Sequence, residues 1–295
     1  MDHFSGYHPF VNLAYFVVVI GISMFFMHPV FLALSLVGGA AYSFYLKGAK
    51  TAKVFFRGML PVCLLMAAIN PLFNHEGATM LFYLKNGNPI TLESIVYGWG
   101  SGMMLAGVVL WFSVFNEVMT SDKLMYLFGK AVPAFSLMLS MSLRFVPRFT
   151  AQIKKVSQAQ QCIGRNITSG NPMERAGHGM KILSITTTWA LENSVETADS
   201  MKSRAYGLRG RTNFSIYRFD RRDTVLTAFI LGSAAVILPC IRSRALAVLY
   251  FPVFTMNVTS PTAILGYVLY GLLCALPVIL NILEDIKWRS LRSGI

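Results

Sequence analysis

Charged residues are scarce in this chain. They make up 13% of its 295 residues, whereas an ordinary soluble domain carries roughly 25%. Hydrophobic residues make up 55%, and the mean hydropathy is +0.55. Intrinsic disorder is excluded, because it requires low hydrophobicity together with high net charge. The composition is typical of an integral membrane protein.

Catalytic, nucleotide-binding and metal-binding motifs are also missing. No GxxxxGK[ST] is present, so ATP binding by a P-loop is excluded, and neither HExxH nor GxSxG occurs. The four cysteines, Cys63, Cys162, Cys240 and Cys274, lie far apart with no CxxC, which disfavours a disulfide framework or a zinc site. Asp and Glu are nearly absent from the long apolar runs, which argues against a proton-coupled carrier. We therefore expect neither an enzyme nor a cofactor bound by this chain.

The apolar runs that are present predict membrane-spanning helices. A helix needs roughly 20 residues to cross the hydrocarbon core. The first run, from Val11 to Leu46, is too long for one crossing, and His28-Pro29 divides it because proline favours the first turn of a helix. The sequence predicts an all-α, polytopic integral membrane protein with about six spans, at 11–27, 29–46, 58–73, 94–118, 224–241 and 262–283.

Basic residues are unevenly distributed between these spans. The segment 121–222 holds 16 of the 26 Lys and Arg residues and only six acidic ones. The loop 47–57 and the C-terminal tail are basic as well. Because cytoplasmic loops collect Lys and Arg, we expect both termini in the cytoplasm. The bilayer then accounts for the basic balance without nucleic acid. Three regions follow: N-terminal spans at 1–120, a cytoplasmic helical segment at 121–222 between spans four and five, and C-terminal spans with a basic tail at 223–295.

The segment 121–222 predicts helices that pack outside the bilayer core. Residues 133–147 form a short apolar stretch that ends at Pro147. Residues 148–163 read as an amphipathic helix with an apolar stripe formed by Phe149, Ile153, Val156 and Ile163. A second long helix is expected from about 172 to 201.

Three carboxylates lie on one face near the end of this second helix. Glu192, Glu196 and Asp199 follow the i, i+4, i+7 spacing. One interpretation is a cation site or an interhelical ion-pair ladder. The other, which we favour, is a polar face paired with nearby basic residues such as Lys202 and Arg204.

Several ordered motifs resemble one known family, the transmembrane T component of energy-coupling factor (ECF) transporters, also called EcfT or CbiQ-like proteins. The resemblance covers nearly the whole chain. The motifs are Asn70-Pro71-Leu72-Phe73 with His75 and Gly77, Leu81-Phe82-Tyr83, Pro89-Ile90-Thr91-Leu92-Glu93, Phe115-Asn116, Ser121-Asp122-Lys123-Leu124, Arg144-Phe145-Val146-Pro147-Arg148, and Ser200 to Gly207 with Gly210-Arg211-Thr212.

The resemblance implies a membrane scaffold of a prokaryotic cell membrane. It would couple two cytoplasmic ABC ATPases (EcfA-like), which bind ATP and Mg²⁺, to a membrane S component that selects a vitamin or a transition-metal ion. In this family two Ala-Arg-Gly motifs at the ends of coupling helices dock on the ATPases. The second motif maps onto Ser203-Arg204-Ala205, followed by Tyr206-Gly207. The first maps onto Cys162-Ile163-Gly164, where the arginine is lost and Arg165 follows one residue later.

Elementary physics supports such docking independently of the resemblance. An arginine at a helix C-terminus gains from the macrodipole, and its planar fork pairs bidentately with a carboxylate. A hydrophobic groove on another protein can bind the apolar face of a helix, here through side chains such as Phe149, Ile153 and Val156. The alternatives are that the stripe packs on the chain's own second helix and that Arg204 is merely solvated.

Two other functions remain open at this level. One is a conventional ABC permease subunit that forms its own translocation path. The other is a membrane enzyme acting on lipid or polyprenyl substrates through cytoplasmic arginines and His178, although no paired carboxylate or metal site supports it. An ECF subunit would co-purify with ATPases and an unrelated small membrane protein, whereas a permease would pair with one type of ATPase and with itself.

Overall fold

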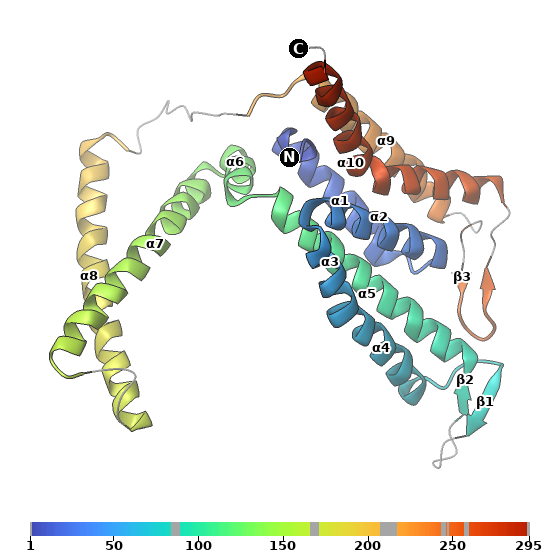
Figure 1. Cartoon of the computed structure of the whole chain (residues 1–295), viewed down its shortest axis with the longest axis horizontal. Helices are drawn as coiled ribbons and strands as arrows, with labels where there is room; N and C mark the ends of the chain where they lie inside the picture. The colour runs from blue at the N-terminus through green and yellow to red at the C-terminus, as the bar shows by residue number, and fades with distance from the viewer. Residues whose placement is uncertain are drawn as a thin grey trace. The chain divides into compact units, whose positions relative to one another are not determined.

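The first apolar run folds as two helices separated by a sharp turn. The computed structural model describes residues 2–83, 89–165, 171–206, 217–242, 246, 248–256 and 260–293, and in it α1 spans Pro9–Phe25 and α2 spans Pro29–Lys47 (Figure 1). His28 is the N-cap of α2, and its ring Nδ1 accepts a hydrogen bond of 3.2 Å from the Val30 amide. Pro29 occupies the first turn, where its missing N–H leaves no bond unmade. The predicted break at His28-Pro29 is confirmed.

The other apolar runs are helical as well. Their bounds are α3 Ala49–Val54, a π-helical turn at Phe55–Met59, α4 Leu60–Phe73, α5 Leu92–Val118, α9 Arg221–Arg242 and α10 Pro261–Ser293. Among the described residues, α2, α5, α9 and α10 are long and apolar enough to cross a membrane, whereas α1 and the segment Arg57–Phe73 are apolar but shorter. The prediction of an all-α polytopic membrane protein is confirmed.

Helix α10 continues beyond its predicted end at 283. It reaches Ser293 through a stretch that contains Lys287, Arg289 and Arg292. No glycine or proline follows Leu283 within the helix, so nothing in the backbone stops it. Hydropathy predicted the apolar part of α10, but it could not predict the extension beyond residue 283, because that part of the helix is polar.

Two short antiparallel strand pairs join the helices at one end of the bundle. Strand β1 (Met80–Tyr83) pairs with β2 (Pro89–Thr91), and β3 (Val248–Leu249) pairs with β4 (Thr255–Met256). The Ala78 amide donates to the Pro252 carbonyl over 2.8 Å, which links the two connections. The sequence indicated turns in the first connection but no strands.

Helix α5 is packed closely within the bundle. It lies against α1, α2 and α4, while α10 packs on α2 and α9. A Cβ placed on Gly102 would lie 2.8 Å from the Cys63 Cα, and one on Gly98 would lie 2.7 Å from the Met66 carbonyl oxygen. The two glycines of the Gly98-xxx-Gly102 pattern therefore let α5 approach the α4 backbone, as small residues do in membrane helices.

Directional hydrogen bonds cross the centre of this bundle. The indole Nε1 of Trp111 on α5 donates to the Ser35 carbonyl at 3.2 Å and to its Oγ at 2.9 Å. The Ser35 hydroxyl on α2 donates to the Ser23 Oγ on α1 over 3.0 Å, and the Tyr270 hydroxyl on α10 donates to the Val19 carbonyl over 3.4 Å. All of these side chains are buried, so the bonds satisfy polar groups that have no access to water.

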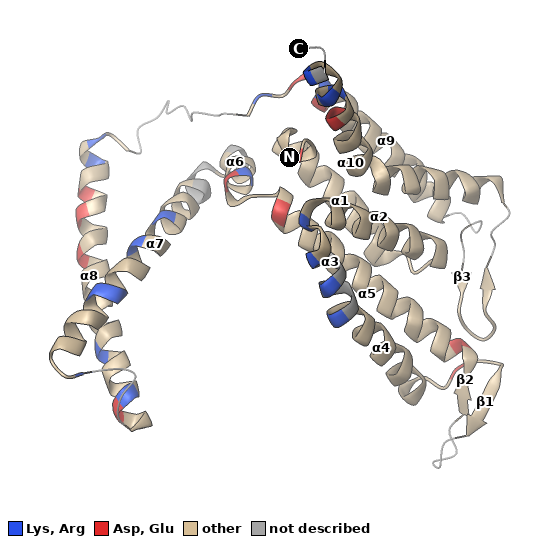
Figure 2. Ribbon diagram, viewed as in Figure 1, with Lys and Arg blue, Asp and Glu red and all other residues tan. Residues whose placement is uncertain are grey.

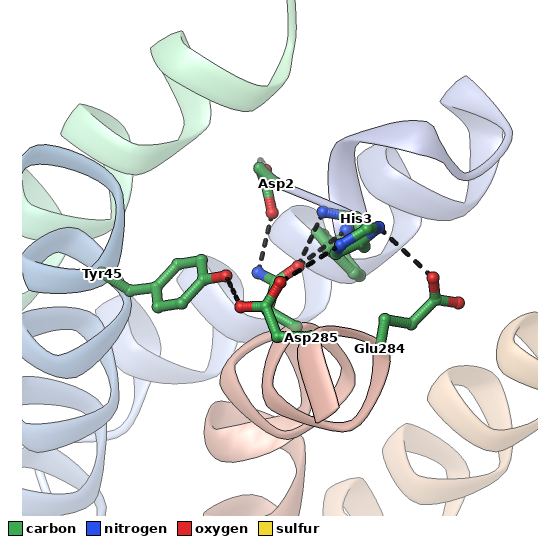
Figure 3. A network of polar contacts seen from close by, with 7 residues as sticks. Asp2, His3, Tyr45, Glu284 and Asp285 are labelled. Atoms are coloured by element: carbon green, nitrogen blue, oxygen red, sulfur yellow. Dashed lines mark hydrogen bonds and ion pairs between the residues drawn. The ribbon is translucent and has the colours of Figure 1, made fainter. Parts of the chain in front are cut away.

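The N-terminal residues are bound to the other end of α10 (Figure 3). The Asn281 Oδ1 accepts from the His3 amide over 2.7 Å, and its Nδ2 donates to the Asp2 carboxylate over 2.8 Å. The Tyr45 hydroxyl on α2 donates to Asp285 over 2.7 Å, and the His3 ring lies 3.4 Å from the same carboxylate. The contacts tie the N-terminal segment, α2 and α10 together.

A buried lysine holds the N-terminal segment against the end of α5. Lys123 belongs to α6 (Ser121–Ala131) and is 5% exposed. Its Nζ donates to the Ser5 carbonyl at 2.6 Å, the Ser5 hydroxyl at 2.8 Å and the carbonyl of Val118, the last residue of α5, at 2.8 Å. Burial lowers the pKa of the ammonium group. The three oxygens compensate the charge and cap α5.

The chain divides into two compact units. One comprises Met1–Leu124 and Tyr217–Ile295, and the other comprises Met125–Ile216. The second unit contains the long helices α7 (Pro133–Cys162) and α8 (Pro172–Ser203). The predicted break at Pro147 is wrong, because α7 runs through it. An internal proline removes one backbone donor, but its fixed φ is compatible with a helix.

Candidate functional site

The helices α7 and α8 lie side by side (Figure 1), and aromatic side chains form their contact. The ring centroids of Phe149 on α7 and Trp189 on α8 lie 5.8 Å apart in an edge-to-face arrangement. The Arg148 guanidinium carbon lies 5.7 Å from the centroid of the Trp189 ring, within range of a cation–π interaction. Phe145 stacks on Phe149 at 5.7 Å. These contacts fix where the two helices meet.

The apolar stripe of α7 is divided between the α8 contact and the exposed surface. Phe149 contacts Trp189, and Val156 is half-buried. Ile153 is 40% exposed and Ile163 is 66% exposed. Part of the stripe therefore packs inside the second unit, as one of the two interpretations expected, and the rest is free for another surface.

Trp189 was not identified as a functional residue from the sequence. On α8, Ile182 and Thr186 are buried, and Trp189 continues the same helical face at half burial. The spacing of four and then three residues is the signal of a packed face, but the surrounding run of threonines conceals it. Beside Trp189 lies a pocket of about 270 Å³ lined by Phe145, Phe149, Thr187, Trp189, Ala190, Leu191, Asn193 and Ser194.

Helix α7 ends in a Schellman motif. The Arg165 amide donates to the Gln160 carbonyl over 2.9 Å, and the Gly164 amide donates to the Gln161 carbonyl over 3.0 Å. Ile163 is the C-cap, and Gly164 has a φ of +80°. Glycine suits this position because it adopts a left-handed conformation without a steric penalty.

Helix α8 ends in the same motif. The Tyr206 amide donates to the Met201 carbonyl over 3.1 Å, and the Ala205 amide donates to the Lys202 carbonyl over 3.0 Å. Arg204 is the C-cap, and Ala205 has a φ of +60°. Ala205 is the one non-glycine residue with positive φ in the described part of the chain. Alanine therefore occupies a position that favours glycine.

The structure brings the sequence-predicted docking residues to these two ends. Cys162 and Ser203 are the last residues of their helices, and both are exposed. Arg204 is exposed and forms no ion pair with any other described residue, whereas Arg165 is half-buried. Gly207, also predicted to support docking, lies outside the described residues.

The three carboxylates of α8 form an exposed acidic face. Asp199 lies 3.9 Å from the Lys202 Nζ, and both side chains are largely exposed. Glu196 and Glu192 are exposed one and two turns earlier. Across residues 2–293, where the structure describes them, no group of three His, Cys, Asp or Glu side chains is arranged to hold a metal ion. The Asp199–Lys202 pair is one part of the pairing that we favoured from the sequence, whereas no ion pair joins Glu192, Glu196 or Arg204 to another described residue.

Comparison with known proteins finds relatives that share one name. No family model matches it. It is 29% identical over 241 residues to the energy-coupling factor transporter transmembrane protein EcfT of Acidaminococcus fermentans, which covers 74% of this chain and 87% of that protein.

Shorter matches carry the same name in other bacteria. The Ruminiclostridium cellulolyticum protein is 33% identical over 93 residues, covering 31% of this chain and 35% of its own length. The Listeria innocua protein is 35% identical over 92 residues, again 31% of this chain and 35% of its own length. These matches show that the chain is similar to energy-coupling factor transporter transmembrane proteins named EcfT from several bacteria.

Proposed function

We propose that this chain is a T component, the coupling subunit of an ECF-type ABC importer. It transmits the movement of two cytoplasmic ABC ATPases to a membrane S component that binds the substrate, a vitamin or a transition-metal ion. The observation that carries the proposal is the pair of exposed helix ends, closed by the same backbone motif at the two positions where the family places its docking motifs.

The end of α8 supplies the charged part of ATPase docking. Arg204 is exposed at the C-cap, where the helix macrodipole favours a positive charge. A guanidinium forms two parallel hydrogen bonds with a carboxylate, so an acidic groove on an ATPase both binds and orients this end. Since no described residue of this chain pairs with Arg204, docking breaks no internal ion pair.

The crossing of α7 and α8 transmits the movement. Phe149, Trp189 and Arg148 interlock there, so a displacement at one helix end changes the exposed surface near the crossing. That surface includes the apolar pocket of about 270 Å³ and exposed residues of α8 such as Leu191 and Val195, which are 65% and 63% exposed. An S component that binds this surface differently in two states would be reoriented by ATP binding.

The chemistry of transport is divided among the subunits. ATP and Mg²⁺ bind to the ATPases, and the S component selects the substrate. This chain is a multi-pass protein of a prokaryotic cell membrane with both termini in the cytoplasm. The positive-inside rule supports that orientation, because Lys50, Lys53 and Arg57 and the basic end of α10 are exposed beyond the apolar helices (Figure 2).

Affinity purification of the tagged full chain tests the proposal. Wild-type protein should bring down ATPase polypeptides and a small membrane protein. Arg204→Glu should release ATPase, because two carboxylates would then face each other. Lys202→Glu, which changes the neighbouring charge outside the motif, serves as the matched control and should retain ATPase. Absence of any ATPase with the wild type would refute the coupling function.

A further inference from the structure

The two helix ends have the same backbone geometry, which allows a comparison residue by residue. In each, the same two hydrogen bonds close the last turn, and the third motif residue has a positive φ. The equivalent pairs are Cys162 with Ser203, Ile163 with Arg204, Gly164 with Ala205 and Arg165 with Tyr206. Ile163 is thus the geometric counterpart of Arg204, and it is 66% exposed.

The side chains of the two ends differ in chemistry. No charged residue occurs from Val156 to Gly164 at the end of α7. The last turn of α8 and its cap carry Asp199, Lys202 and Arg204 (Figure 2). The same backbone geometry therefore presents an apolar side chain, Ile163, at the end of α7 and a guanidinium, that of Arg204, at the end of α8.

One groove cannot serve both ends well. A groove that binds a guanidinium needs a carboxylate. If an isoleucine occupied that groove, the carboxylate would be buried without a positively charged partner, at a cost in free energy. A groove that binds isoleucine gains from excluding water around apolar surface, and an arginine there would lose hydration without compensation. Selection between the ends therefore follows from the penalty for the wrong pairing as much as from the gain for the right one.

We propose that Ile163 is a specificity-determining docking residue, which inserts into an apolar groove on one ATPase while Arg204 binds an acidic groove on a different one. This inference rests on the proposed coupling function. It requires that the two ATPase surfaces be chemically unlike, and that α7 dock through burial of apolar surface instead of an ion pair. Docking at α8 is then weakened by salt, whereas docking at α7 is not.

Substitution at position 163 distinguishes this proposal from a simpler one. Ile163→Arg gives α7 the side chain that α8 has. If both grooves were acidic, this variant would retain more ATPase than the wild type. An apolar groove predicts at least a tenfold loss of the ATPase bound at α7, and Ile163→Val should stay within twofold of the wild type. A monodisperse elution profile of each full-length variant shows that the membrane helices are folded.

Photo-cross-linking identifies which ATPase lies at each end. A benzophenone amino acid is placed at position 163 or 204 of the full chain in membranes of its host, and the adducts are identified by mass spectrometry. We expect two different polypeptides that each contain a GxxxxGK[ST] motif. The same polypeptide at both positions, or an adduct at 204 alone, overturns the proposal and leaves the coupling function intact. If neither position cross-links to an ATPase, the coupling function itself is refuted.

Discussion

The two helix caps allow one backbone effect to be tested with opposite signs in one molecule. Ala205 and Gly164 occupy the same left-handed position, with φ values of +60° and +80°. Ala205→Gly removes a Cβ from a position that disfavours it, whereas Gly164→Ala introduces one. Nothing lies within 4 Å of a Cβ built at Gly164, so the effect there comes from the backbone conformation alone.

The magnitude follows from two opposing contributions. A left-handed conformation costs an L-residue about 1–2 kcal/mol. Glycine also makes the open end more flexible, which offsets about 0.4–1 kcal/mol of the gain. We therefore expect Ala205→Gly to stabilise the cap of α8 by about 0.5–1 kcal/mol and Gly164→Ala to destabilise that of α7 by a similar amount. At 1.4 kcal/mol for each factor of ten, these values correspond to roughly two- to fivefold changes in cap opening.

Hydrogen–deuterium exchange of the full chain in nanodiscs measures cap opening directly. The amides of Ala205 and Tyr206 bond to Lys202 and Met201, so their exchange requires the cap to open. Ala205→Gly should slow exchange in the peptide that contains them, and Gly164→Ala should speed exchange at the end of α7. Each variant leaves the other end as its internal control. Faster exchange in Ala205→Gly, or no effect in either variant, would refute the assignment of this cap geometry.

Two further substitutions test the first unit, each by the midpoint of thermal unfolding in detergent, followed by tryptophan fluorescence. Lys123→Met should lower stability by about 2–4 kcal/mol, because it leaves buried oxygen acceptors without a donor; the exposed Lys50→Met is the control, and equal midpoints for the two variants would contradict the buried geometry. Gly102→Ala should cost about 1–3 kcal/mol by overpacking, since the new methyl group meets the Cys63 backbone. Gly21→Ala, which has open space around it, should cause no loss, and the packing argument fails if both glycine variants behave alike.

Much of the membrane-embedded fold could be predicted from the sequence, because hydropathy and the helix-breaking dipeptide His28-Pro29 act locally. The departures arise where local patterns carry no signal. Pro147 was expected to break a helix, yet one missing donor did not end α7. The attachment of the N-terminus depends on residues almost a chain length apart, such as Asp2 and Asn281, which no periodicity reveals.

The candidate site was likewise predictable from the sequence only in part. The motif around Arg204 was visible from the sequence, and the structure places it at an exposed helix end. The motif mapping also placed Ile163 at the position of Arg204, but it could not show that both helix ends close with the same hydrogen bonds and with a positive φ at Gly164 and Ala205. The sequence showed that the arginine is missing there, and the structure adds that the side chain in its position, Ile163, is exposed.

The hydrogen bonds of Trp111, Ser35, Ser23 and Tyr270 have a consequence for motion. Inside a bilayer no water can replace a partner that slides away, so a rotation or shift of one helix by a fraction of a turn leaves polar groups unsatisfied. Helices α1, α2, α5 and α10 are thereby locked in rotational register and move as one block. Any conformational cycle of this protein must then be accommodated by parts of the chain outside that block.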